Sequence, residues 1–457
     1  MPSTLPRQIL PGSYGPGTSA SACYATAVKP QIQSLRPFRA GYWFGGFNGL
    51  TWMMSLGTPM VLLLEQLGGS SFQVGLASSF VYLLYPIQVL ATAMLERLGF
   101  RHQMVLGWGA RAFFLLVPLG LAWLAPGAPD RWMANALVLS VFLFCVCRAF
   151  GGAAHIPWLA AILPEPLRGR FFATEGAITS AVGVLALLTC TGLFAALPTY
   201  VAFRWVYGIA IFGSAAAVLC LLRLPAGPRP APSPIRHMMA EAVGLSLRPG
   251  LFRHYLMFEL LSSVAIFSFG AFTSYYLKAE VGLASSAIMS FTAATFAGRI
   301  LGSLAIRHWI DRVVIRCFFQ SAHLVFVGVF LFWLAVVRGE VFALTTLGAS
   351  YFAFGVAAGV GQAAHMTFLP EISPMEKRPV ALAVFGAVTG VVSGVAPMLW
   401  GLALRTGGAQ PGVDIGNFTI YFGLGAGLST LVLVLLPGLP DPRGHTSRQP
   451  SGDRRYL

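Results

Sequence analysis

Charged residues are scarce in this chain. Asp, Glu, Lys and Arg together make up 10% of its 457 residues, whereas ordinary soluble domains contain roughly 25%. Acidic residues are the scarcest, with 15 Asp and Glu against 30 Lys and Arg. Together with 56% hydrophobic residues and a mean hydropathy of +0.73, this composition excludes a soluble globular protein.

Cysteine is also rare, and its placement excludes a disulfide framework. Cys23 lies in a polar N-terminal stretch, and the other five lie in or beside apolar runs. Cys145 and Cys147 are two residues apart on a predicted helix, so they point to different faces and make a poor metal pair. The chain also lacks a phosphate loop, a metal-ligand cluster and a nucleophile elbow. We therefore expect neither an enzyme nor a cofactor.

Long apolar runs are what the chain has instead. They are continuous rather than alternating in polarity, which favours membrane-spanning helices over the strands of a barrel. Gly, Pro and charged residues divide these runs into twelve predicted spans. The spans lie near residues 40–64, 72–95, 103–125, 132–156, 171–196, 200–222, 251–277, 282–306, 314–337, 341–368, 379–403 and 417–437.

The basic residues are distributed unevenly between the two sides of the membrane. With the N-terminus inside, 22 of the 30 Lys and Arg residues fall in cytoplasmic segments and five in outer loops. Such a bias is the positive-inside signal, so both termini are predicted to be cytoplasmic. The net charge of +15 is thereby explained by topology, and we expect no nucleic-acid partner. The predicted location is the inner membrane of a bacterium.

A proline-rich stretch divides the chain into two similar parts. Ala153-Ala154-His155 recurs as Ala363-Ala364-His365, 210 residues later, and each copy lies near the end of the fourth span of its part. An even number of spans per part predicts parallel repeats related by an axis along the membrane normal. The predicted organisation is a flexible tail (1–38), a six-helix bundle (39–223), a linker (224–250), a second six-helix bundle (251–437) and a C-terminal tail (438–457).

Three motifs in this arrangement resemble those of the major facilitator superfamily, over essentially the whole of 38–437. The segment 96–101 is similar to the family loop Gly-x-x-x-Asp-Arg-x-Gly-Arg-Arg/Lys, and 311–316 is a weaker second copy. The segment 148–152 resembles Arg-x-x-Gln-Gly, with Gly in place of Gln. The segment 164–172 resembles an Arg-Gly-Arg-Phe/Tyr-Phe junction. The resemblance implies an all-α fold of twelve helices and alternating access around a midplane site.

The first motif also implies a cytoplasmic gate. In the family these loops are thought to latch the gate through charged contacts. The residues that this implies for gating are Glu96, Arg97, Arg101, Asp311 and Arg312. The alternative is a solvated loop that only obeys the positive-inside rule, because a surface ion pair contributes about 0 to 1 kcal/mol.

Three arginines remain inside the predicted spans once those near the span ends are counted with the loops. A charge at bilayer depth costs about 2.5 kcal/mol or more, so such residues face the bundle interior and find partners there. Arg148, well inside the fourth span, is the best candidate to pair with a carboxylate or phosphate of a substrate. The alternative is a structural pair between helices. Arg111 and Arg299 lie closer to the cytoplasmic side, where snorkelling or gate pairing is expected.

Two acids lie within spans. Glu259 in the seventh span is the predicted coupling residue, because a carboxyl group in an apolar setting suits reversible protonation. The alternative is a helix-end acid that reaches water or pairs with Arg253. Glu175, near the start of the fifth span, is expected to be structural.

Polar and aromatic residues on the spans that line the cavity in the family are further candidates. They are Asn48, Thr51, Trp52, Tyr85, Tyr275, Tyr351 and Gln362. The alternative for each is packing in the core. His155 and His365 are expected to be structural. Gly386, Gly390 and Gly394 are spaced by four and predict a face where another helix approaches closely.

The sequence thus predicts a monomeric secondary transporter that moves a small solute, with protons as a candidate coupling ion and lipids as its surroundings. Arg148 and the lack of a Gly-Pro-x-x-Gly-Gly signature in the fifth span favour a polar or anionic metabolite. The alternatives are a multidrug-type effluxer and a transport-inactive assembly or interaction factor.

Overall fold

The computed structural model describes residues 35–126, 131–164, 167–228, 244, 249–306, 309–310, 313–339, 343–373, 378–404 and 415–438. This part of the chain contains 11 helices that are long and apolar enough to cross a membrane, or 12 if one bent pair counts as a single span. They coincide with the twelve predicted spans to within a few residues. The largest extensions are at the ends of the fourth and tenth spans, which run on to Ile162 and Ile372.

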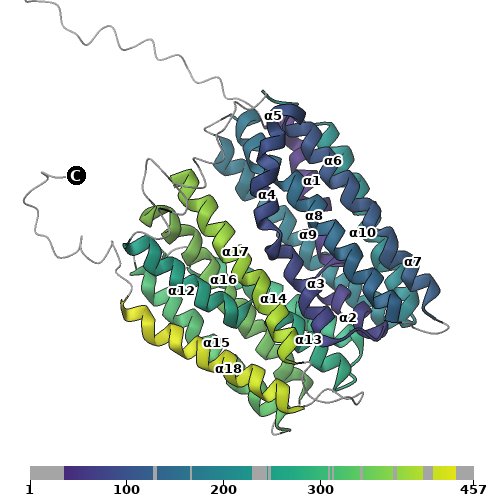
Figure 1. Cartoon of the computed structure of the whole chain (residues 1–457), viewed down its shortest axis with the longest axis vertical. Helices are drawn as coiled ribbons and strands as arrows, with labels where there is room; N and C mark the ends of the chain where they lie inside the picture. Colours follow the sequence, from purple (N-terminus) through teal and green to yellow (C-terminus); the bar gives the residue numbers. More distant parts are fainter. Residues whose placement is uncertain are drawn as a thin grey trace, which may run out of the picture.

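The helices form two groups that follow one another along the chain (Figure 1). The first half comprises η1 (Arg36–Phe38), α1 (Arg39–Ser55), α2 (Thr58–Gln66), α3 (Ser71–Leu83), α4 (Tyr85–Ala91), η2 (Thr92–Met94), α5 (Leu95–Leu98), α6 (Phe100–Phe114), α7 (Leu116–Leu124), α8 (Arg131–Ile162), α9 (Arg168–Ala196) and α10 (Thr199–Leu222). The second half comprises α12 (Leu251–Ile266), α13 (Phe269–Ala279), α14 (Ser285–Ile306), α15 (Ile315–Val337), α16 (Leu344–Ile372), α17 (Arg378–Ala403), α18 (Ile415–Leu435) and η5 (Leu436–Gly438).

Several spans are broken, and the breaks have local causes. The first span divides at Gly57, whose φ of 66° suits a residue without a side chain, and Pro59 then lies in the first turn of α2. The seventh span divides at the corresponding place, Phe267 and Ser268. In the second span, α3 and α4 separate at Leu84, two residues before a proline that cannot donate a backbone hydrogen bond. A bend of 47° follows between Ser71–Gln88 and Thr92–Leu98.

The same contacts recur in the two halves. Arg101 at the start of α6 donates to the carbonyl of Leu222 at the end of α10. Arg316 at the start of α15 donates to the carbonyl of Pro437 in η5 at 3.0 Å, across the same separation of 121 residues. The sequence repeat is therefore also a structural repeat.

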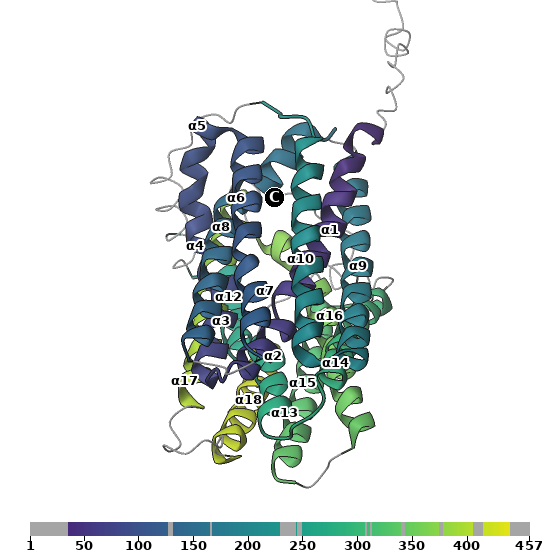
Figure 2. The ribbon, with the colours of Figure 1, turned by 90° about the vertical axis from the view of Figure 1, so that its right-hand side faces the viewer.

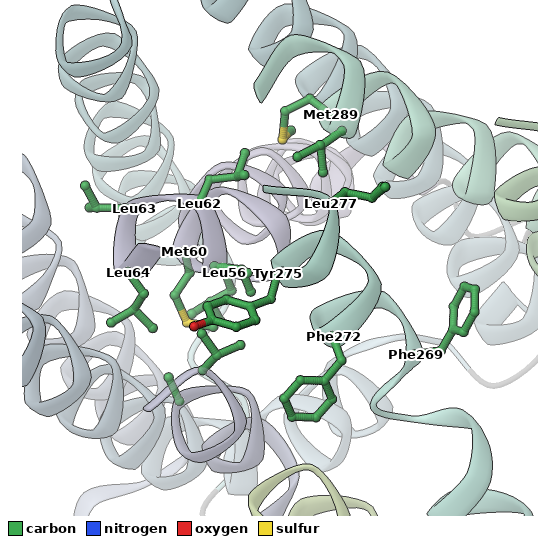
Figure 3. Packing of buried hydrophobic residues seen from close by; sticks show 14 of the residues in the cluster. Leu56, Met60, Leu62, Leu63, Leu64, Phe269, Phe272, Tyr275, Leu277 and Met289 are labelled. Atoms are coloured by element: carbon green, nitrogen blue, oxygen red, sulfur yellow. The ribbon is translucent and has the colours of Figure 1, made fainter. Parts of the chain in front are cut away.

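The two halves are joined at one end and have separate cores at the other. At the end that holds Leu224, which we call the linker end, one apolar cluster surrounds Trp158 in the first half and another surrounds Phe368 in the second. At the opposite end, a single cluster runs through α2, α3, α13 and α14 (Figure 2). Figure 3 shows its centre, where the ring of Tyr275 lies beside Met60 and Leu56.

Polar and backbone contacts reinforce this joined end. The hydroxyls of Thr58 and Thr292 lie 2.8 Å apart, between α2 and α14. Ser71 on α3 donates to the carbonyl of Gly401 on α17 at 3.2 Å. Of the predicted glycine face, Gly394 lies against the backbone of Leu83 and Gly390 against the ring of Tyr85. Gly386 has no neighbour within 4 Å of the position a side chain would take, so the prediction holds for two of the three glycines.

The tightest helix pair was not predicted. Gly298 and Gly302 on α14 face Gly355 and Gly359 on α16, and a β-carbon at any of the four would collide with a backbone carbonyl of the other helix. Spacing by four on both helices lets the backbones approach, as in other pairs of membrane helices.

Gly355→Ala is expected to lower the free energy of unfolding by about 1 to 3 kcal/mol, because the added methyl group must push α14 and α16 apart. Thermal unfolding in detergent measures the effect. Gly427→Ala on α18 is the control, since no atom lies within 4 Å of its added β-carbon. Equal unfolding temperatures for the two variants would contradict the predicted close contact.

Candidate substrate site

Arg148 is half-buried on α8, among residues of three other helices. Its guanidinium carbon lies 5.4 Å from the ring centroid of Trp52 on α1 and 5.5 Å from that of Tyr85 on α4. One terminal nitrogen donates to the carbonyl of Val81 on α3, and its Nε is buried without a partner. Both aromatic rings stabilise the positive charge through their faces. The structure thus brings three predicted site residues together around one guanidinium.

Tyr82 extends this cluster to the second half. Its ring packs at 6.0 Å against Tyr85 and at 4.9 Å against Phe267, at the break between α12 and α13. Arg299 on α14 is close enough for its charge to act on Tyr82, and its NH2 group donates to Gln362 on α16 at 3.5 Å. The cluster therefore lies at the interface of the two halves.

Arg111 corrects an expectation from the sequence. It was predicted to snorkel or to join a gate, but only 1% of its surface is exposed. Its guanidinium donates to Asn48 at 2.7 Å, and it lies 4.4 Å from the ring centroid of Trp108 and 5.3 Å from that of Phe144. The orientation of α6 places the side chain inside the first half. The prediction rested on how few residues separate Arg111 from a cytoplasmic loop, and that separation does not show which way the side chain points.

Glu259 lies in a separate polar cluster on the linker side of the second half. A pair with Arg253 was the alternative to a coupling role. In the structure a carboxyl oxygen of Glu259 lies 4.0 Å from Nδ1 of His365, which is an ion pair only when the histidine is protonated. Tyr255 shares a hydrogen bond of 2.7 Å with the same histidine. Glu259 and His365 keep 23% and 18% of their side chains exposed.

His323 on α15 was missed by the sequence analysis. It is 4% exposed, shares a hydrogen bond of 3.0 Å with Ser262 and lies 2.9 Å from the carbonyl of Phe319. The signal that could have found it is a lone histidine in an otherwise apolar run. With Glu259 and His365, it gives the second half three titratable residues on neighbouring helices.

Three predicted cavity residues pack in cores instead. Thr51 is fully buried and donates to the carbonyls of Phe47 and Ala210 at 3.0 and 3.2 Å, between α1 and α10. Tyr275 belongs to the packed cluster at the joined end. Tyr351 is 2% exposed among Phe269, Phe291 and Trp333. The alternative of core packing therefore describes these three residues.

The predicted gate is described only in its first copy. Glu96 and Arg97 are exposed on α5, and Arg101 binds within the first half, as described above. Glu96 has an interaction partner of its own. Asp311 and Arg312 lie outside the described residues. A latch between the halves stays a prediction. Glu175, as expected, has a structural environment: it accepts from Thr179 at 3.4 Å and packs against Gly45.

Known structures identify the class of this fold. No protein-family model and no curated protein matches the sequence. The structure is similar to a mutant of the nucleoside transporter NupG, with a TM-score of 0.64 at 13% identity, covering 88% of this chain and 99% of the other. It is also similar to the inward-open xylose transporter XylE from E. coli, with a TM-score of 0.63 at 13% identity over 89% and 96% of the two chains. A mutant of the peptide transporter POT gives a TM-score of 0.65 at 12% identity over 89% and 95%. The chain therefore has the predicted major facilitator superfamily fold of a multi-pass membrane protein.

Proposed function

We propose that the chain is a secondary transporter that moves a small polar or anionic solute through the space between its halves. The observation that carries the proposal is the position of Arg148 with Trp52 and Tyr85 at the interface of the halves. The fold supports it, because the similar structures are of transporters for nucleosides, xylose and peptides. No enzymatic role is proposed.

The conformation supports alternating access. The halves share one apolar core at the α2 and α13 end and have separate cores at the linker end. We interpret this as the state open toward the linker, and the bias of the basic residues supports a cytoplasmic position for that side. Rocking the halves about the site, with the joined end separating, would give the opposite state.

We further propose that Glu259 couples transport to protons. Its carboxyl group lies beside His365 and keeps access to water in this state. The other spanning acid, Glu175, is held by Thr179 against α1. A coupling acid must reach water in one state and lose that access in the other, and Glu259 fits the first condition.

The test is uptake of a mixed metabolite pool into proteoliposomes, read by mass spectrometry with and without an imposed pH gradient. If one proton accompanies one solute, a gradient of one pH unit supports about tenfold accumulation. Glu259→Gln is expected to lose this accumulation while still exchanging solute across the membrane. Glu175→Gln is the matched control and should keep both activities. Absence of flux for every solute would reject transport and favour the assembly-factor alternative.

A further inference from the structure

Arg111 is a buried charge without an acid among the contacts that the described residues give it. Its contacts are one amide oxygen, from Asn48, and the rings of Trp108 and Phe144. A buried cation is normally compensated by an acid, and a half-compensated one is costly.

Arg148 and His155 also have buried polar atoms without a partner. The Nε atoms of Arg111 and Arg148 and the Nε2 atom of His155 are all buried without a hydrogen-bond partner. Arg111 contacts Asn48 on α1 and Phe144 on α8. Arg148 lies one helical turn from Phe144 on α8 and contacts Trp52, one turn from Asn48 on α1, so the two guanidiniums are near each other. Guanidinium nitrogens can only donate. The interior of the first half therefore contains two guanidiniums that each have a donor without an acceptor, beside a histidine whose Nε2 also lacks a partner.

The second half shows that the fold does not require an arginine here. Phe44 and Trp108 pack on each other at 6.0 Å, as Tyr255 and Phe319 do at 5.6 Å in the second half. His155 lies against Phe44 as His365 lies against Tyr255. In this correspondence Glu259 takes the place of Asn48. The second half thus has an acid where the first half has a neutral amide beside a cation.

We propose that Arg111 and Arg148 together bind an oxyanion, a carboxylate or phosphate group carried by the transported solute. This inference rests on the proposed function and specifies the substrate class. Arg148 is half-buried and meets the ligand first, and the anion takes the place of the Val81 carbonyl as its acceptor. Arg111 supplies the second positive charge, which the neutral amide of Asn48 does not compensate. Trp52 and Tyr85 flank the rest of the solute.

The decisive variant is Asn48→Asp, which keeps the shape of the side chain and adds the missing negative charge beside Arg111. We expect it to raise the unfolding temperature of the ligand-free protein by about 2 °C or more. Arg111→Gln in the same background should remove that gain, since the aspartate then has no cation to pair with.

The same variants test binding with defined probes. The probes are inorganic phosphate, succinate and benzoate, each added to the full-length protein in detergent. Chloride at equal ionic strength is one control. The uncharged counterparts glycerol, succinamide and benzamide are the other. At least one anion is expected to raise the unfolding temperature of the wild type. Asn48→Asp, Arg111→Gln and Arg148→Gln should each lose that shift.

Arg204→Gln is the matched control. Arg204 also stacks on a tryptophan, 3.9 Å from the ring centroid of Trp123, and donates to the carbonyl of Ala122 at 3.1 Å, but it lies on α10 near the outer end of the first half. This variant should keep the response to anions.

Two results of the binding test would overturn the proposal. One is that the three anions stabilise the wild type no more than their uncharged counterparts. The other is that Asn48→Asp leaves the ligand-free protein no more stable and keeps the response to anions. Flux of an uncharged solute that survives Arg111→Gln would reject the anion site but keep the transporter. Anion binding without flux of any solute would keep the anion site but reject the transporter.

Discussion

A disulfide between α2 and α14 is expected to stop transport completely. Thr58 and Thr292 join the halves at the end opposite the linker, where their hydroxyl oxygens are 2.8 Å apart. Cysteines at both positions would place two sulfurs close to the separation of about 2 Å that a disulfide requires. If the halves must separate here to release or admit solute, an oxidised Thr58→Cys/Thr292→Cys protein cannot complete the cycle.

The measurement is solute uptake by this double variant before and after oxidation, and again after a reductant is added. Uptake should fall to the level of empty liposomes on oxidation and return on reduction. Cys317 is exposed, so it is first replaced by serine to prevent other disulfides. Each single cysteine variant controls for the substitution itself. Full uptake by a protein shown to be crosslinked would contradict alternating access at this contact.

Removing the guanidinium of Arg148 is expected to have the second largest effect. Arg148→Ala takes away the positive charge between Trp52 and Tyr85 and the donor to Val81. A hydrogen bond to a charged group contributes about 1.5 to 3 kcal/mol, so uptake at low solute concentration should fall by up to about a hundredfold.

The pattern across variants separates binding from folding. Arg148→Lys keeps the charge but not the planar fork, so it should recover part of the uptake. Arg204→Ala should transport normally, because Arg204 lies away from the interface of the halves. The unfolding temperature of each variant is measured alongside. If Arg148→Ala folds and transports as the wild type does, Arg148 does not bind solute and has only a structural contact between α8 and α3.

The spans and their repeat could be predicted from the sequence because the bilayer imposes a length and a polarity on each segment. The apolar runs predicted the helices to within a few residues, including α9 (Arg168–Ala196) and α15 (Ile315–Val337). The recurring Ala-Ala-His predicted equivalent places for His155 and His365, and both pack against an aromatic residue of the first helix of their half.

The site was predicted only in part. Arg148 was chosen because a charge inside a span is costly, and Trp52, Tyr85 and Asn48 because the family resemblance implies that their spans line a cavity. The structure gives Arg148, Trp52 and Tyr85 a common environment. Thr51 met the same criterion but satisfies its hydroxyl within the core. A polar residue on a spanning helix can turn to a cavity or to a backbone carbonyl, and its spacing along the chain does not distinguish the two.

The sequence by itself determined which segments cross the membrane, because an apolar solvent accepts only helices whose backbone groups are satisfied within the segment. The tertiary structure alone decided which side chains meet. The burial of Arg111 beside Asn48, the pairing of Glu259 with His365 and the contact of Thr58 with Thr292 all join helices far apart in sequence. Such partners depend on the rotation and approach of packed helices, which glycines such as Gly355 control and which apolar periodicity does not encode.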